Sequence, residues 1–85
     1  MPRQELMKIR VDFEDGQPVP IKFKYVTEEK EILTVTVLRI TKRDINNFAG
    51  NRMLVYLCES LDTKDIVKNY ELRYELDSCK WYFYF

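Results

Sequence analysis

The feature that most constrains this chain is an alternation of apolar and polar residues with a period of two. In residues 70–76, tyrosine and leucine alternate with glutamate and arginine. Successive side chains of a strand point to opposite faces of a sheet, so this pattern predicts strands with one buried face. The same alternation over residues 7–13 and 21–25 predicts two more strands, with a turn at the Gly- and Pro-containing stretch between them.

The chain ends on five consecutive aromatic residues, Trp81–Phe85, which form either an exposed contact surface or part of the core. A turn at Asp77-Ser78 gives these opposite positions: Leu76 and Cys79, Tyr74 and Trp81, Leu72 and Phe83, Tyr70 and Phe85, Glu75 and Lys80, Arg73 and Tyr82, Glu71 and Tyr84. Apolar residues then share one face, and the other face combines a salt bridge with an arginine–tyrosine contact. This register makes most of the aromatic run core and leaves Tyr82 and Tyr84 as contact candidates. Asp-Ser is not a favoured pair for a two-residue turn, so a longer turn with a shifted register is the alternative.

Two segments depart from simple alternation. In residues 32–42, ILTVTVLRITK, the apolar positions shift by one at Val37-Leu38, which an intact strand accommodates only with a bulge or a sharp bend. Residues 53–58, MLVYLC, are apolar on both faces. They predict a central strand covered on both sides, or a strand that crosses from one sheet to another.

These strands predict the fold class. A chain of 85 residues is the size of one domain, spanning residues 1–85, and its 46% hydrophobic content is sufficient for a core. We expect an all-β domain of five to six antiparallel strands, either a small SH3-like or OB-like barrel or a strongly bent sheet. Residues 41–52, TKRDINNFAGNR, are compatible with one short helical turn near 43–50, capped by Thr41 and ended by Gly50.

The composition argues against catalysis. Histidine is absent, which removes the commonest general base and most zinc sites. The two glycines stand alone, so no phosphate-binding loop is present. We expect no catalytic, cofactor or metal site and no enzymatic activity. The cysteines are expected to be free thiols, with a Cys58–Cys79 disulfide as the alternative.

Charge and hydropathy bear on the chain's surroundings. The 14 basic and 14 acidic residues cancel, so no global field attracts nucleic acid or an anionic membrane. No secretory h-region is visible, and the longest apolar run is far below the ~18 residues of a membrane helix. We expect a cytoplasmic protein without a membrane partner.

One local patch has the composition of a partner-binding site, because residues 39–52 combine basic side chains, asparagines and a phenylalanine. The candidate partner-binding residues are Arg39, Lys42, Arg43, Asn46, Asn47, Phe48, Asn51, Arg52, Tyr82 and Tyr84. The first hypothesis is a non-catalytic protein-binding module or accessory subunit. The alternative is single-stranded nucleic-acid binding through this basic, Asn-rich loop. The same residues also suit an ordinary solvated loop whose Phe48 seals the domain, and an open sheet would allow a homodimer through the C-terminal strand.

Overall fold

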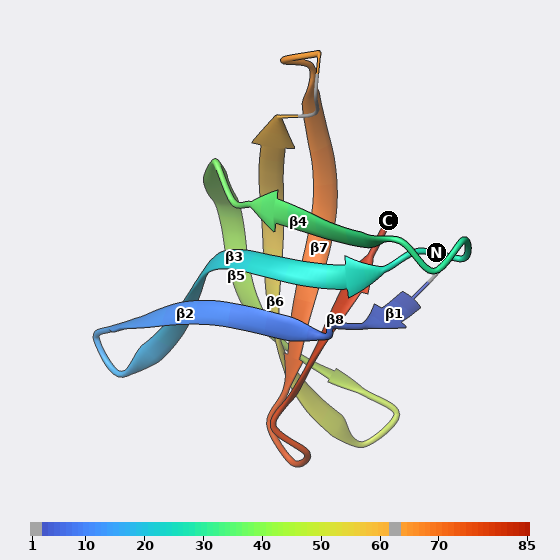
Figure 1. Cartoon of the computed structure of the whole chain (residues 1–85). Coiled ribbons are helices and arrows are strands. Elements are labelled where there is room, and N and C mark those ends of the chain that lie inside the picture. Colours follow the sequence, from blue (N-terminus) through green and yellow to red (C-terminus); the bar gives the residue numbers. More distant parts are fainter. Residues whose placement is uncertain (1–2, 62–63) are drawn as a thin grey trace.

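The computed structural model describes residues 3–61 and 64–85, which form eight strands joined by turns (Figure 1). The strands are β1 (Arg3–Glu5), β2 (Lys8–Glu14), β3 (Gln17–Val26), β4 (Ile32–Thr36), β5 (Arg39–Phe48), β6 (Asn51–Leu61), β7 (Val67–Glu75) and β8 (Lys80–Tyr84). Within the described residues, no helix is long and apolar enough to cross a membrane.

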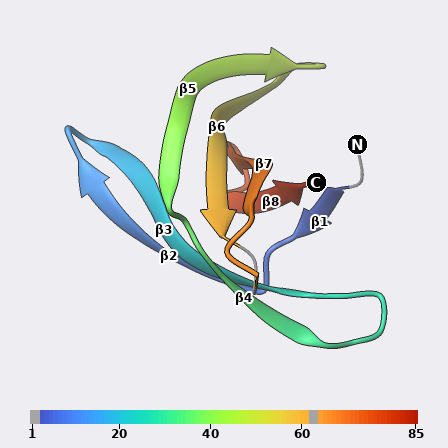
Figure 2. The same cartoon turned by 90° about the horizontal axis from the view of Figure 1, so that it is seen from above.

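The strands form two antiparallel sheets. The larger has the order β1-β8-β7-β6-β5 and the smaller the order β2-β3-β4. Both views show the smaller sheet lying across one face of the larger one, with its strands running in a different direction (Figures 1 and 2). The predicted all-β class with antiparallel pairing is confirmed. The described strands form two separate sheets and no closed barrel.

The terminal hairpin has the predicted register. Tyr74 lies opposite Trp81, Leu72 opposite Phe83 and Glu75 opposite Lys80. The turn is longer than two residues, since it spans residues 76–79 with Cys79 at a φ of 60°. The Cys79 amide donates a 2.9 Å hydrogen bond to the Glu75 carbonyl and closes this turn. The longer turn leaves the pairing of β7 with β8 in the predicted register.

The shift at Val37-Leu38 marks a change of sheet. The Val37 amide donates to the Ile21 carbonyl in the smaller sheet at 2.8 Å, whereas the Leu38 amide donates to the Glu59 carbonyl in the larger sheet at 2.8 Å. Residues 32–42 are therefore two strands, and the chain bends sharply between them, as the loss of phase predicts.

The helical turn expected near 43–50 is wrong. Those residues belong to β5 and to a two-residue turn at Ala49-Gly50, whose φ angles are 51° and 89°. Positive φ at both central positions defines the type I′ turn, which matches the twist of a hairpin. Gly50 thus belongs to the turn that joins β5 to β6 and does not end a helix. Thr41 lies at a bulge between Ile40 and Lys42. Pairing along all of β5 outweighs weak local capping signals.

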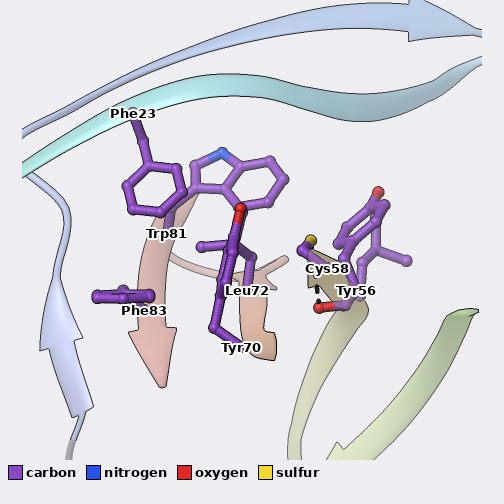
Figure 3. Close-up of a cluster of buried hydrophobic side chains, with 8 residues drawn as sticks. Phe23, Tyr56, Cys58, Tyr70, Leu72, Trp81 and Phe83 are labelled. Carbon is purple, nitrogen blue, oxygen red and sulfur yellow. Dashed lines mark hydrogen bonds between the residues drawn. The ribbon is translucent and has the colours of Figure 1, made fainter. Parts of the chain in front are cut away.

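The core lies between the two sheets and is mainly aromatic (Figure 3). Its buried residues are Phe23 of β3, Leu54, Tyr56 and Cys58 of β6, Tyr70 and Leu72 of β7, and Trp81 and Phe83 of β8. The Phe23 and Phe83 ring centroids are 5.2 Å apart, so rings from both sheets touch. On the opposite face of β6, Met53 and Val55 are also buried. The predicted central strand is confirmed, since β6 lies between β5 and β7. Its outer face is covered at Met53 and Val55 but not at Leu57, which is 38% exposed.

Replacing a fully buried core leucine tests this packing. We expect Leu72→Ala, which empties a site with 0% exposure, to lower the free energy of unfolding by about 2–5 kcal/mol through lost burial and the cavity left behind. Urea denaturation measures the change. The matched control is Leu38→Ala at a site with 57% exposure, for which the loss should stay below about 1 kcal/mol. Equal losses in the two variants would contradict the assigned core.

Candidate binding surfaces

The candidate contact residues occupy two faces of the larger sheet. We call the face that packs on the smaller sheet the inner face and the opposite one the outer face. Residues directly opposite each other across an antiparallel pair share a face. Arg43 lies opposite the core residue Tyr56 and therefore on the inner face. Asn47 and Arg52 lie opposite each other on the same face, so three candidates are on the inner side. The outer face carries Arg39, Lys42, Asn46, Phe48, Asn51, Tyr82 and Tyr84.

On the outer face, Arg73 of β7 lies between two of the candidate rings. Its guanidinium carbon is 4.2 Å from the ring centroid of Phe48 and 4.0 Å from that of Tyr84. It also forms an ion pair with Glu71. A guanidinium so close to two ring faces gains cation–π stabilisation. The tip of the β5–β6 hairpin is therefore attached to β7 and β8, and the expected arginine–tyrosine contact forms with Tyr84, diagonally across the hairpin.

The remaining candidate ring is partly covered in the same way. The guanidinium carbon of Arg3 lies 4.6 Å from the ring centroid of Tyr82. This contact exists because β1 pairs with β8 and places Arg3 opposite Tyr84. Residues 3–5 carry no recognisable strand pattern, since three residues are too short for a periodic signal. β8 is consequently flanked by β1 and β7, and strand addition at β8 requires β1 to leave.

The β5 strand forms an exposed surface at one edge of the larger sheet. Arg39 is engaged by Glu59 of β6, with 2.7 Å between Nε and Oε1. Farther along, Ile45 is 53% exposed, one of several large apolar side chains that reach the surface. It lines a hollow of about 340 Å³ together with Arg43, Leu54 and Tyr56. Gln17 and Asp44 also line it, so the hollow combines an apolar floor with one basic and one acidic side chain.

A larger groove lies between β4 and the ends of β6, β7 and β8. Its volume is about 790 Å³. Tyr70, Phe83 and Phe85 contribute aromatic surface, and Val35 and Leu61 contribute aliphatic surface. Sequence reasoning missed this groove, because it depends on how the two sheets are placed relative to each other. Each lining segment looks like an ordinary strand in the sequence.

Two buried ionisable groups stay neutral at physiological pH. Burial raises the pKa of the Cys58 thiol from 9.0 to about 12. Burial also raises the pKa of Tyr70 to about 12, and its hydrogen bond with Ser60 opposes that rise. Because the folded state holds these protons more tightly, the linked stability is complete below the unfolded pKa values and is lost as pH rises towards 12.

Both cysteines are free thiols, as expected. Cys58 is buried on β6 and Cys79 is exposed in the β7–β8 turn. The Cys79 thiol donates a weak hydrogen bond to the Leu76 carbonyl at 3.9 Å. The two thiols therefore differ in access and, through burial, in acidity.

The comparisons with known proteins identify no relative. No protein-family model matches the chain, and no curated protein or solved structure is significantly similar to it. Any functional conclusion therefore rests on the chain's own surfaces.

A double-mutant cycle tests the contact between Arg73 and Phe48. We expect Arg73→Met and Phe48→Leu to be coupled by about 0.5–1 kcal/mol in the free energy of unfolding, because each change removes the same cation–π contact. Urea denaturation of the single and double variants measures the coupling. The control pairs Arg73→Met with Phe13→Leu, at a site with 73% exposure, and should be additive within about 0.3–0.5 kcal/mol. A coupling no larger than in the control would show that the contact contributes nothing.

Alkylation tests the environments of the two thiols. We expect iodoacetamide at about pH 8 to modify Cys79 and to spare Cys58 in the folded protein, because the thiolate is the reactive form and burial disfavours it at Cys58. Mass spectrometry of proteolytic fragments reads the modified sites. In urea both thiols should react, and Cys79→Ser should leave the folded protein unmodified. Comparable rates at the two sites without urea would rule out the buried position of Cys58.

Proposed function

We propose that the chain is a non-catalytic module that binds a protein partner through the β5–β6 hairpin. The observation that carries the proposal is the surface of β5, an edge strand on which Ile45 remains exposed beside a hollow. An exposed apolar side chain flanked by basic and amide groups is typical of the centre and rim of a protein interface. The hollow gives such an interface a position for one apolar side chain of the partner.

The charges of the hairpin support a partner of acidic character. Arg39 is offset by Glu59, which leaves Lys42, Arg43 and Arg52 against Asp44. Arg43 lines the hollow together with Asp44, and a partner carboxylate beside an inserted apolar residue would complement Arg43. Attraction between the two charges would mainly accelerate association and select the partner.

The covered rings favour protein over nucleic acid as the partner. Binding of single strands relies on aromatic faces that are open for base stacking. Arg73 lies against Phe48 and Tyr84, and Tyr84 retains only 8% exposure. Arg3 covers part of the Tyr82 ring. The three candidate rings therefore offer little open surface for base stacking.

Substitutions on β5 test the proposal. We expect Ile45→Asp and Arg43→Glu each to reduce recovery of the partner by about tenfold, since they place a charge or the wrong charge at the centre of the surface. The measurement is quantitative mass spectrometry after affinity capture with the full chain, followed by binding to the purified partner. Lys24→Glu, at an exposed site on the smaller sheet, serves as the matched charge control.

A titration with mixed-sequence single-stranded DNA and RNA distinguishes nucleic-acid binding from binding of a protein partner. Amide shifts confined to residues 39–52 that weaken steeply with added salt would favour nucleic acid, because phosphate contacts release counterions. A partner set unaffected by Ile45→Asp and Arg43→Glu would refute the assigned surface.

A further inference from the structure

The two sheets have four edge strands, and three of them carry features that discourage pairing with another chain. β1 is only three residues long and contains Arg3 and Glu5. β2 has alternating charges and a bulge between Arg10 and Val11. β5 carries basic residues and a bulge next to Ile40. Charges, bulges and short edges are the means by which proteins avoid unwanted strand addition.

The fourth edge, β4, lacks this protection. Its sequence, ILTVT, contains no charged residue, proline or glycine, and no bulge interrupts its pairing with β3. Charges, bulges or short length thus protect three of the four edges, whereas the uncharged β4 edge has no such feature. This contrast distinguishes β4 as the edge that is suited to receiving a strand.

The backbone of β4 shows which groups are available. The Val37 amide bonds to Ile21 of β3, so it points away from the open edge. The Thr36 carbonyl instead accepts a 2.8 Å hydrogen bond from Ser60 Oγ of β6, so it points towards the groove. Amide and carbonyl groups alternate sides along an antiparallel strand. The amide and carbonyl of Thr34 therefore also face the groove.

Below this edge, none of the described strands covers the larger sheet. The ends of β6 and β7 reach past β4, where the smaller sheet stops (Figure 1). Leu61 and Phe85 are exposed there, and Tyr70 and Phe83 line the bottom of the 790 Å³ groove. A fourth strand next to β4 would cover these side chains and extend the smaller sheet.

We propose that the β4 edge and this groove bind an extended, uncharged peptide segment of another protein by strand addition. Its backbone pairs with β4 around Thr34, and alternate apolar side chains pack against Leu61, Tyr70 and Phe85. Main-chain hydrogen bonds supply affinity, and the apolar lining selects alternating side chains. This site is separate from the β5 surface, and the inference stands whether or not β5 binds a partner.

The shape of the edge favours a peptide over a second copy of the chain. Symmetric antiparallel pairing of β4 with its copy would place both larger sheets on the same face of the joined sheet. The ends of β6 and β7 that project past β4 (Figure 1) would then compete for one space. A single strand fits beside β4 without that conflict.

The test uses a capped synthetic peptide of about nine residues, in which valine alternates with threonine and a glutamine at each end adds polarity without charge. The isotopically labelled full chain is titrated with it, and backbone amide shifts are followed. We expect saturable shifts at residues 32–38, 60–61 and 69–70, together with slower hydrogen exchange at the Thr34 amide.

Two substitutions at one position separate strand pairing from simple burial. Thr34→Pro removes an edge-facing amide without removing a bond to β3, and proline is tolerated on edge strands. We expect it to weaken peptide binding by about tenfold or more, the equivalent of at least one lost hydrogen bond. Thr34→Val keeps the amide and should bind within about twofold of the original chain. Circular dichroism checks that both variants fold. If Thr34→Pro does not fold, the exchange rate of the Thr34 amide with and without peptide decides.

Each other outcome overturns the inference. Unchanged binding to Thr34→Pro would mean that the peptide occupies the groove without pairing. Equal binding of a peptide with the same composition in separate valine and threonine blocks would exclude readout of alternation. Self-association that Thr34→Pro abolishes, with no peptide binding, would identify a second copy as the occupant. Shifts confined to β5 would reject the β4 site while supporting the proposed function.

Discussion

The structure depends on the bend at Val37-Leu38, where neighbouring amides bond to different sheets. Because β4 ends in the smaller sheet and β5 begins in the larger one, the two sheets cross and enclose the aromatic core between them. The same bend leaves β4 at an open edge and β5 at another. The chain also changes sheets at Leu6-Met7, where the Leu6 amide bonds to Trp81 of the larger sheet and the Met7 amide to Lys24 of the smaller one. The core and both candidate binding surfaces thus depend on these two crossings between the sheets.

Aromatic residues hold this arrangement on both faces of the larger sheet. On the inner face, Phe23 contacts Phe83 across the two sheets. On the outer face, Arg73 lies between Phe48 and Tyr84 and attaches the hairpin tip. Several residues with the chemistry of a binding site therefore serve folding. The proposed binding surfaces are instead Ile45 with its basic neighbours and the groove beside β4.

Local patterns in the sequence were sufficient to predict some of the strands and insufficient to predict others. The terminal hairpin register could be predicted because it places the apolar residues on one face and Glu75 opposite Lys80, and β6 could be recognised because both of its faces are apolar. The full length of β5 could not be predicted, since its polar residues are equally suited to a loop and its pairing depends on β6. The contact of Arg73 with Phe48 and the groove beside β4 were also inaccessible, because both join segments that are distant in the sequence.

Residue-level amide hydrogen exchange of the free protein tests the central claim most directly, namely that β4 is an open edge over an uncovered groove. The account predicts slow exchange at Leu33 and Val35, whose amides face β3, and fast exchange at Thr34, whose amide faces the groove. A Thr34 amide as protected as that of Val35 would contradict it, because the edge would then already be covered.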